Sequence, residues 1–124
     1  MNETSQLPLL ACVDAQLSAL CIFTGKDIAS TMRQILHQVC RDETVFPTLQ
    51  FDGGGELSAS WHVEGSSLWV IVGQDGEVTA HCTWRRPYTV WHLPDNLQEV
   101  RDCLYDLSSY VQRHNANWQE LFAS

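Results

Sequence analysis

Between residues 57 and 84 the hydrophobicity alternates with a period of two, and tight turns interrupt the alternation. This pattern is typical of half-buried strands, whose successive side chains point to opposite faces of a sheet. It predicts three strands, at residues 57–63, 68–72 and 78–84. Gly65-Ser66 and Gln74-Asp75-Gly76 separate the strands and have the composition of hairpin turns. We therefore expect an antiparallel meander, with residues 88–92 as a fourth strand at its edge.

Helical periodicity flanks the meander on both sides. Apolar residues recur at steps of three and four in segments 7–22 and 27–41 and again after Pro94. In the last helix Asp95 fits the N-cap, with Gln98 three residues further on as in a capping box. Beyond this helix a short docking turn is predicted from Trp118, Leu121 and Phe122. The element order predicts an α+β fold in two layers: a three- to four-stranded antiparallel meander with helices before and after.

The length of the chain favours one domain. Domains mostly contain about 100–150 residues, and this chain has 124, of which 44% are hydrophobic. We expect residues 1–6 to form a flexible N-terminus and residues 7–124 to form a single α+β domain.

The first turn predicts the register of the first hairpin. With Gly65-Ser66 as its two central residues, Val63 lies opposite Leu68, and His62 lies opposite Trp69. A slip of one residue would move every side chain to the other face, so the hydrophobic pattern excludes it.

The second turn extends this register to the third strand. A two-residue loop would pair Val72 with the polar Thr79, whereas a three-residue loop with a left-handed Gly76 pairs Val72 with Val78. We adopt the three-residue loop. The predicted core face then holds Leu57, Ala59, Trp61, Val63, Leu68, Val70, Val72, Val78, Ala80, Cys82 and Trp84. The opposite face holds Ser58, Ser60, His62, Trp69, Ile71, Thr79, His81 and Thr83.

On the second face, His62, Trp69 and His81 are expected to form one row across the strands. An exposed tryptophan among small hydroxyl side chains suits an anchor for a protein interface. Two alternatives remain open. The N-terminal helix covers this face and buries Trp69 as core, or the two histidines bind a metal ion, for which no third ligand is evident.

Acidic residues outnumber basic ones, which limits the partners of the chain. There are 15 Asp and Glu but only 7 Lys and Arg, so the net charge is −8. Nucleic acids and anionic membranes are bound through clustered Lys and Arg, so neither is expected as a partner. Four acids of the last helix form a stripe opposite its apolar side: Asp95, Glu99, Asp102 and Asp106. This stripe is either a solvated helix face or an array that meets a basic surface.

The sequence contains no motif typical of catalysis or of cofactor binding. The glycine-rich run at residues 52–55 leads into a strand, whereas phosphate-binding loops lead into a helix. The five cysteines lack the spacing of zinc sites or of a disulfide framework, so we expect free thiols, no metal ion and no cofactor. No signal peptide or membrane-spanning run is recognisable, which predicts a cytoplasmic location in a bacterium or in the host of a phage.

The central hairpins resemble a pattern in a group of small bacterial and phage proteins. The resemblance rests on Asp52-Gly53-Gly54 with Leu57 and Trp61, and on Asp75-Gly76-Glu77-Val78 after the apolar strand at residues 68–72. Those proteins share a helix, a hairpin with this glycine-rich start, a second turn of the Asp-Gly-x-Val type and a closing helix. The resemblance implies a bacterial or phage origin and an α-β-α order, and it implies no activity.

Size, acidity and the polar sheet face favour a binding protein rather than an enzyme. We expect a small inhibitor or neutraliser of a partner protein, the type to which immunity proteins, antitoxins and phage anti-CRISPR proteins belong. Its partner would present a basic surface that otherwise holds nucleic acid. The expected interface comprises His62, Trp69, Ile71, His81, Asp95, Glu99, Asp102 and Asp106. The alternatives are an enzyme or small-ligand domain that uses the polar face, an adaptor or structural subunit of an oligomer, and a homodimer through that face.

Overall fold

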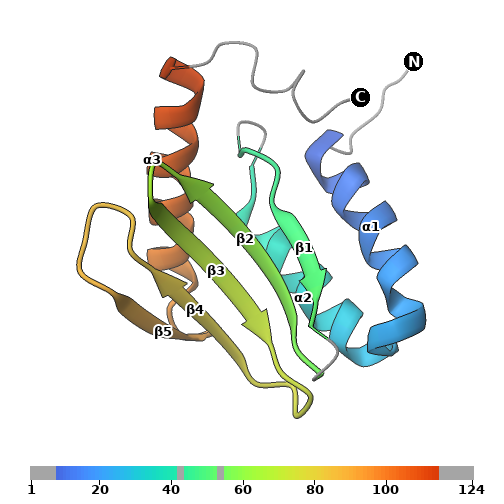
Figure 1. Cartoon of the computed structure of the whole chain (residues 1–124). Coiled ribbons are helices and arrows are strands. Elements are labelled where there is room, and N and C mark those ends of the chain that lie inside the picture. Colours follow the sequence, from blue (N-terminus) through green and yellow to red (C-terminus); the bar gives the residue numbers. More distant parts are fainter. Residues whose placement is uncertain (1–7, 42–43, 53–54, 115–124) are drawn as a thin grey trace.

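The computed structural model describes residues 8–41, 44–52 and 55–114 (Figure 1). The helices in these ranges are α1 (Pro8–Thr24), α2 (Lys26–Val39) and α3 (Leu97–His114). The strands are β1 (Thr48–Phe51), β2 (Leu57–Val63), β3 (Ser66–Val72), β4 (Val78–Cys82) and β5 (Thr89–Leu93). The expected flexible segment at residues 1–6 and the expected docking turn around Trp118 lie outside the described residues.

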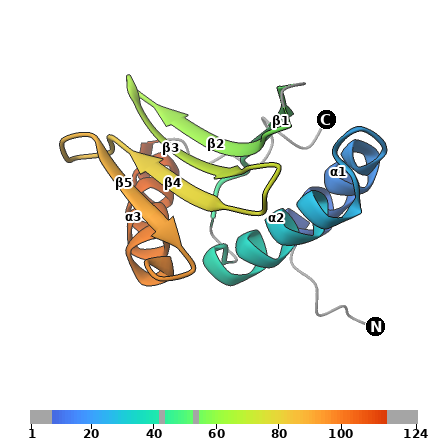
Figure 2. The ribbon, with the colours of Figure 1, turned by 90° about the horizontal axis from the view of Figure 1, so that it is seen from below.

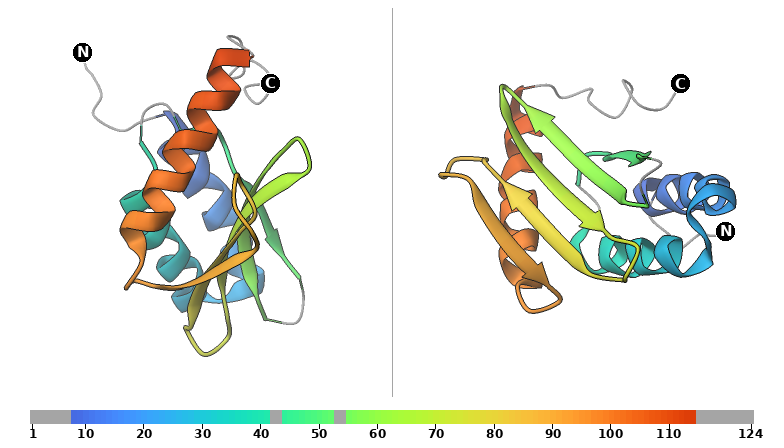
Figure 3. Two further views of the ribbon diagram at one scale, coloured as in Figure 1. Left: turned by 90° about the vertical axis from the view of Figure 1, so that its left-hand side faces the viewer. Right: turned by 60° about the horizontal axis from the view of Figure 1, so that its bottom comes forward.

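These elements form an α+β fold in two layers, as the sequence predicts. The strands make one antiparallel sheet in the order β1-β2-β3-β4-β5, which is a meander. Helices α2 and α3 lie against one face of the sheet, while α1 lies beside the edge strand β1 and packs along α2 (Figure 2, Figure 3). The inner face is the side covered by α2 and α3, and the outer face is the opposite side.

Strand β1 is missing from the sequence-based prediction of three or four strands. It pairs with β2 over its whole length, from Thr48 opposite Ser60 to Phe51 opposite Leu57. The strand has only four residues and directly follows Pro47, so the sequence shows a break where the strand begins. Proline is compatible with this position, because β1 is an edge strand and proline has no N–H to offer to the ladder.

The inner face is the core side of the sheet, which confirms the predicted alternation. The residues expected there are buried with the exception of Val63, which is half-buried: Leu57, Ala59, Trp61, Leu68, Val70, Val72, Val78, Ala80, Cys82 and Trp84. The helices contribute fully buried side chains to the same core, among them Met32, Leu36, Val100, Leu104 and Leu107. The apolar stripes of the helices and the alternating strands thus bury each other, as a two-layer domain requires.

Helix α3 begins one residue later than predicted. Leu97 is its first residue, and the carbonyl of Asn96 accepts the first helical hydrogen bond from Val100 (3.2 Å). Asn96 therefore occupies the N-cap position in place of Asp95. Gln98 donates its side-chain amide to Asp102 Oδ1 (2.8 Å), so it does not act in the predicted capping box.

The first hairpin turns one residue earlier than predicted. Glu64 and Gly65 are its central residues and both have positive φ, 50° and 83°, which is the type I′ arrangement favoured in two-residue hairpins. Val63 consequently pairs with Ser66, so the predicted pairing of Val63 with Leu68 is wrong. The difference amounts to a shift of two residues along β3.

The lengths of the two strands explain the observed register. It places Leu57 opposite Val72 and pairs all seven residues of β2 with the seven of β3. The predicted register would have placed Leu57 opposite Gln74, in the next turn. Because the shift is two residues, each side chain keeps its predicted face. The second turn has the predicted three-residue form, with φ of 85° at Gly76 and Val72 opposite Val78.

The segment between α2 and β1 is tied into the core by two hydrogen bonds. The indole N–H of Trp61 on β2 donates to the carbonyl oxygen of Val45 (2.8 Å), and the N–H of Val45 donates to Ser108 Oγ on α3 (3.1 Å). Trp61, Val45 and Ser108 are all buried, so each bond satisfies polar groups that water cannot reach. The sheet and α3 are thereby joined through the backbone of one residue.

Candidate functional site

The outer face carries the sheet residues that the sequence assigns to a partner interface. Trp69 on β3 lies opposite Ser60 on β2 and opposite His81 on β4. The predicted row of His62, Trp69 and His81 is wrong for His62, which lies opposite Ser67 and not opposite Trp69. The reason is that the first turn comes one residue earlier than predicted. The His62 ring still meets Trp69 edge-on, with ring centres 5.1 Å apart and an interplanar angle of 86°. Ile71 follows Trp69 on the same face of β3.

Helix α1 borders the outer face and does not cover it. It packs against β1 and α2 (Figure 2). Its Leu20 lines a hollow together with Trp69. Trp69 and Ile71 are half-buried, whereas their neighbours Leu68 and Val70 on the inner face are fully buried. Trp69 keeps part of its surface exposed, so the alternative that α1 buries it as core is not what the structure shows.

Two hollows adjoin at the outer face and the β1 edge of the sheet. The first has a volume of about 450 Å³; Trp69 and Ile71 line it from the outer face, and Leu20 on α1 with Leu49 and Phe51 on β1 line it at the edge. The second has a volume of about 430 Å³ and extends over the turn between β3 and β4. Glu56 and Ile71 line both hollows, so the two are neighbours, and we name them together the outer-face groove.

Acidic side chains line one end of this groove. They come from the β1–β2 turn and the β3–β4 turn, which return to the same end of the sheet because alternate turns of a meander do so. We name Asp52, Glu56, Asp75 and Glu77 the acidic rim; all four residues are exposed. Among the described residues that line the groove, none is Lys or Arg. The first hollow of the groove is thus lined largely by apolar side chains, and the charged residues that line the groove are all acidic.

The two turns of the acidic rim are in direct contact. Gly55 has φ of 102°, and a Cβ added to it would lie 2.0 Å from the side chain of Gln74, so only glycine leaves room for that side chain. Within the turns, Asp52 Oδ1 accepts the N–H of Glu56 (3.2 Å), and Asp75 Oδ1 accepts the N–H of Glu77 (3.0 Å). Two of the rim carboxylates, those of Asp52 and Asp75, therefore also order the turns that present them.

The acidic rim was not among the site residues predicted from the sequence. Residues 52–55 and 74–76 were interpreted only as turns, and the acids were sought on the last helix instead. The signal that could have revealed the rim is topological. In a meander with known turns, the first and third turns must lie at one end, and here both are acidic.

His81 is engaged by its neighbours at both ring nitrogens. Nδ1 lies 2.6 Å from the hydroxyl of Tyr88 and Nε2 lies 3.3 Å from Thr79 Oγ1, while the His81 and Tyr88 rings stack at 5.8 Å. A metal ion would have to displace one of these contacts. The part of the chain that the structure describes contains no group of three His, Cys, Asp or Glu side chains placed to hold a metal ion.

Three members of the predicted acidic stripe lie on α3, which packs against the inner face, so they are separate from the groove; Asp95 precedes the helix and is not part of a helical stripe. Asp95, Glu99 and Asp102 are exposed, and Asp106 is half-buried. Asp106 Oδ2 accepts hydrogen bonds from the indole of Trp84 (2.8 Å) and from Arg85 Nη1 (3.0 Å). Asp106 therefore joins α3 to the segment that follows β4.

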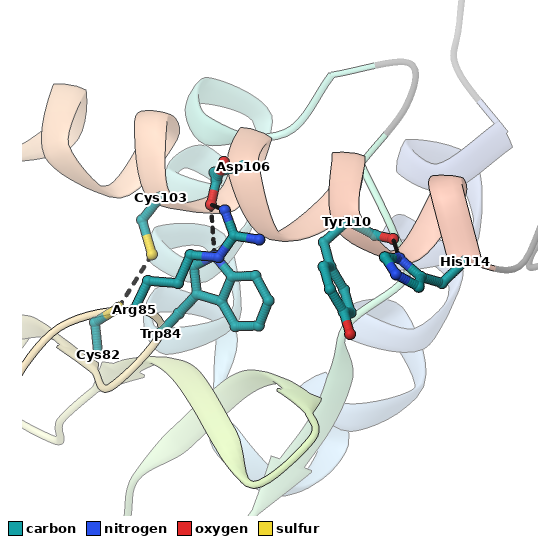
Figure 4. Close-up of polar contacts among 7 residues, drawn as sticks. All are labelled: Cys82, Trp84, Arg85, Cys103, Asp106, Tyr110 and His114. Atoms are coloured by element: carbon teal, nitrogen blue, oxygen red, sulfur yellow. Dashed lines mark hydrogen bonds and ion pairs between the residues drawn. The ribbon is translucent and has the colours of Figure 1, made fainter.

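This contact belongs to a cluster along α3 (Figure 4). The guanidinium of Arg85 lies 4.9 Å from the ring centre of Trp84 and 5.7 Å from that of Tyr110. Tyr110 donates its hydroxyl to Glu64 and stacks on His114 at 4.1 Å. We name Trp84, Arg85 and Asp106 the tryptophan clamp, since their hydrogen bonds join the segment after β4 to α3.

No protein-family model, no curated protein and no solved structure matches the chain. A search of the described helices for a segment of sufficient length and apolarity to cross a bilayer finds none.

Proposed function

We propose that the protein is a small acidic inhibitor or neutraliser that docks a basic surface of a partner protein in its outer-face groove. The observation that carries this proposal is the groove itself, where half-buried Trp69 and Ile71 adjoin the four carboxylates of the acidic rim. Immunity proteins, antitoxins and anti-CRISPR proteins work by occupying a partner in this general way.

The two parts of the groove support different steps of binding. A large aromatic residue that becomes fully buried contributes mainly to the lifetime of a complex, and Trp69 retains exposed surface to bury. Exposed charges of one sign mainly accelerate encounter with a surface of opposite sign. The net charge of −8 adds to the local field of the rim. A lysine- and arginine-rich surface, such as one that binds nucleic acid, fits both properties.

Comparative capture from bacterial lysate tests the use of the groove. Tagged wild type, Trp69→Ala and Tyr105→Ala are compared; Tyr105 is an exposed aromatic residue on α3 and is the matched control. The proposal expects a basic protein in stoichiometric amount with wild type and with Tyr105→Ala, and its loss with Trp69→Ala. Identical captured proteins for all three, or a wild-type dimer that Trp69→Ala converts to a monomer, would overturn it.

The contribution of the rim is tested with charge-matched variants. Glu56→Gln, Asp75→Asn and Glu77→Gln together remove three charges from the rim, and Asp95→Asn, Glu99→Gln and Asp102→Asn remove three from the stripe. We expect the rim variant to slow association with the captured partner and to flatten its salt dependence more than the stripe variant does. The reverse order would place the partner on α3.

A further inference from the structure

Two buried cysteines meet between the sheet and α3, outside the groove. Cys82 ends β4 and Cys103 lies on α3, and their sulfur atoms are 3.0 Å apart (Figure 4). Both side chains are almost completely buried, with exposed fractions of 1% and 2%. All five cysteines of the chain are free thiols in the structure, and the sulfur–sulfur contact joins only these two.

We propose that Cys82 and Cys103 form a redox-active dithiol that a peroxide converts to a disulfide between β4 and α3. A disulfide has a sulfur–sulfur distance of about 2.05 Å, so the two sulfur atoms need to approach by about 1 Å. The two sulfur atoms are already within hydrogen-bond distance. Helix α3, which carries Cys103, is held in place by its own side chains that are buried in the core.

Either thiol of the pair can donate the hydrogen bond to the other, and we assign the attack to Cys82 from the groups around it. A hydrogen bond from the Cys103 thiol lowers the pKa of Cys82 despite its burial, and the backbone N–H of Trp84 and the charge of Arg86 act in the same direction. The pKa of Cys103 is raised, first because its thiol donates to Cys82 and then because it is buried. Since the thiolate is the nucleophilic form, Cys82 reacts first and Cys103 second.

The reaction has two balanced steps. The Cys82 thiol releases its proton to solvent, and the thiolate attacks one oxygen of hydrogen peroxide; an S–O bond forms, the O–O bond breaks, and the departing hydroxide combines with the released proton to become water. The sulfur of Cys103 then attacks the sulfenic acid; the S–S bond forms, the S–O bond breaks, and the Cys103 proton leaves with the hydroxide as a second water. In total the two thiols lose two electrons, and one peroxide gains them and is reduced to two water molecules.

The tryptophan clamp lies beside the dithiol. Trp84 comes shortly after Cys82, beyond the end of β4, and Asp106 comes shortly after Cys103 on α3; the indole hydrogen bond of 2.8 Å joins the two. Arg85, whose side chain is 51% exposed, lies on the solvent side of this bond. A peroxide is small enough to reach sulfur through local opening of such a contact, whereas a bulky thiol reagent needs a larger opening.

Oxidation of the folded full-length chain tests the proposal. The protein is treated with hydrogen peroxide, its remaining thiols are alkylated in denaturant, and its peptides are identified by mass spectrometry. The expected result is a Cys82–Cys103 cross-linked peptide that dithiothreitol reverses. Cys40 is the internal control, because it is also buried and burial raises its pKa to about 12, but it has no sulfur partner; it should remain a thiol. Oxidation of Cys40 at an equal rate, or cross-links that join Cys12 or Cys21 instead, would overturn the proposal.

Single variants separate the two steps. Cys103→Ser should stop at the Cys82 sulfenic acid, which dimedone labels, and Cys82→Ser should give neither a label at Cys103 nor a cross-link. If either variant folds poorly, the unfolding midpoint of the wild type decides. The cross-link restricts the unfolded chain, so the oxidised protein should unfold at higher denaturant concentration than the reduced protein. If the completely cross-linked protein unfolds at the same or a lower denaturant concentration than the reduced protein, the disulfide is strained in the native fold, and this result would count against the proposal.

Discussion

The two faces of the sheet are built from the same strands and differ in what they contact. On the inner face, alternate residues of β3 such as Leu68 and Val70 are fully buried. On the outer face, Trp69 and Ile71 alternate with them in the same strand and are half-buried. The inner face is closed by the chain itself, whereas the outer face keeps a groove with an acidic rim.

Under the proposed function, this difference separates the residues that stabilise the fold from those that bind the partner. The inner face supplies the apolar burial that holds the domain together, so substitutions there are expected to change the free energy of unfolding. Substitutions on the outer face remove less buried surface, so they are expected to alter binding while the fold persists. Paired substitutions on the two faces test this expected difference.

The largest effect is expected for Leu104→Ala on α3. Leu104 is fully buried against the inner face, and truncation of such a leucine costs about 2–5 kcal/mol of the free energy of unfolding. Ile71→Ala on the outer face should cost less than half as much in the same denaturant titration. Equal losses for the two variants would show that both faces belong to the core.

A smaller loss is expected for Trp61→Phe, compared with Trp69→Phe on the other face. Trp61→Phe removes the indole N–H that Val45 O accepts in the buried core, which costs about 1–3 kcal/mol of the free energy of unfolding. Trp69→Phe should cost less, since Trp69 is only half-buried. Chemical denaturation followed by far-ultraviolet circular dichroism measures both without relying on tryptophan fluorescence. A greater loss for Trp69→Phe would contradict the assignment of the faces.

The tryptophan clamp marks where the inner face reaches solvent, and we expect an intermediate contribution from it. Asp106→Ala removes the acceptor of Trp84 and Arg85, and it should cost about 1 kcal/mol because the carboxylate is partly solvated. Asp102→Ala, one turn earlier on the same helix, is the control and should cost less. If thermal unfolding shows the two to be equal, the clamp contributes nothing beyond an ordinary surface contact.

The smallest effect concerns α1, which borders the groove. Burial alone would raise the pKa of Asp14, but hydrogen bonds and charges from His37 and Arg33 on α2 outweigh it and lower the pKa below its usual value. A lowered carboxylate pKa contributes stability that is present above the unfolded-state pKa and is lost as the pH falls through the folded-state pKa. Asp14→Asn should therefore flatten the acid limb of a plot of unfolding free energy against pH. An unchanged acid limb would contradict this role of Asp14.

Much of the inner face could be predicted from the sequence, because burial imposes a period that the residues display. The alternation around Trp61 and Val70 and the helical spacing around Met32 and Leu104 each identify a buried side. Strand β1 could not be predicted in this way, since four residues after a proline carry too short a pattern. The first hairpin failed for a related reason: Glu64-Gly65 and Gly65-Ser66 are both plausible turns, and only the pairing of the full strands distinguishes them.

The candidate site was predictable only in part. The alternation placed Trp69, Ile71, His62 and His81 on the second face, which the strand pairing confirms as a shared face. The acidic rim and the contact between Cys82 and Cys103 join segments distant in sequence, and no local pattern reports such proximity. The spacing of acids along α3 gave no sign that Asp106 contacts Trp84, because that contact depends on how α3 lies on the sheet.

The dissociation rate of the captured partner from Trp69→Ala, relative to wild type, is the sharpest test of whether the outer-face groove holds the partner. Loss of a buried aromatic anchor worth about 2 kcal/mol predicts dissociation roughly 30-fold faster, with the variant still folded. The same rate for both proteins would contradict the account, because the partner would then be held by a surface other than the outer-face groove. Unfolding of Trp69→Ala in the absence of a partner would contradict it too, because the outer face would then be part of the core.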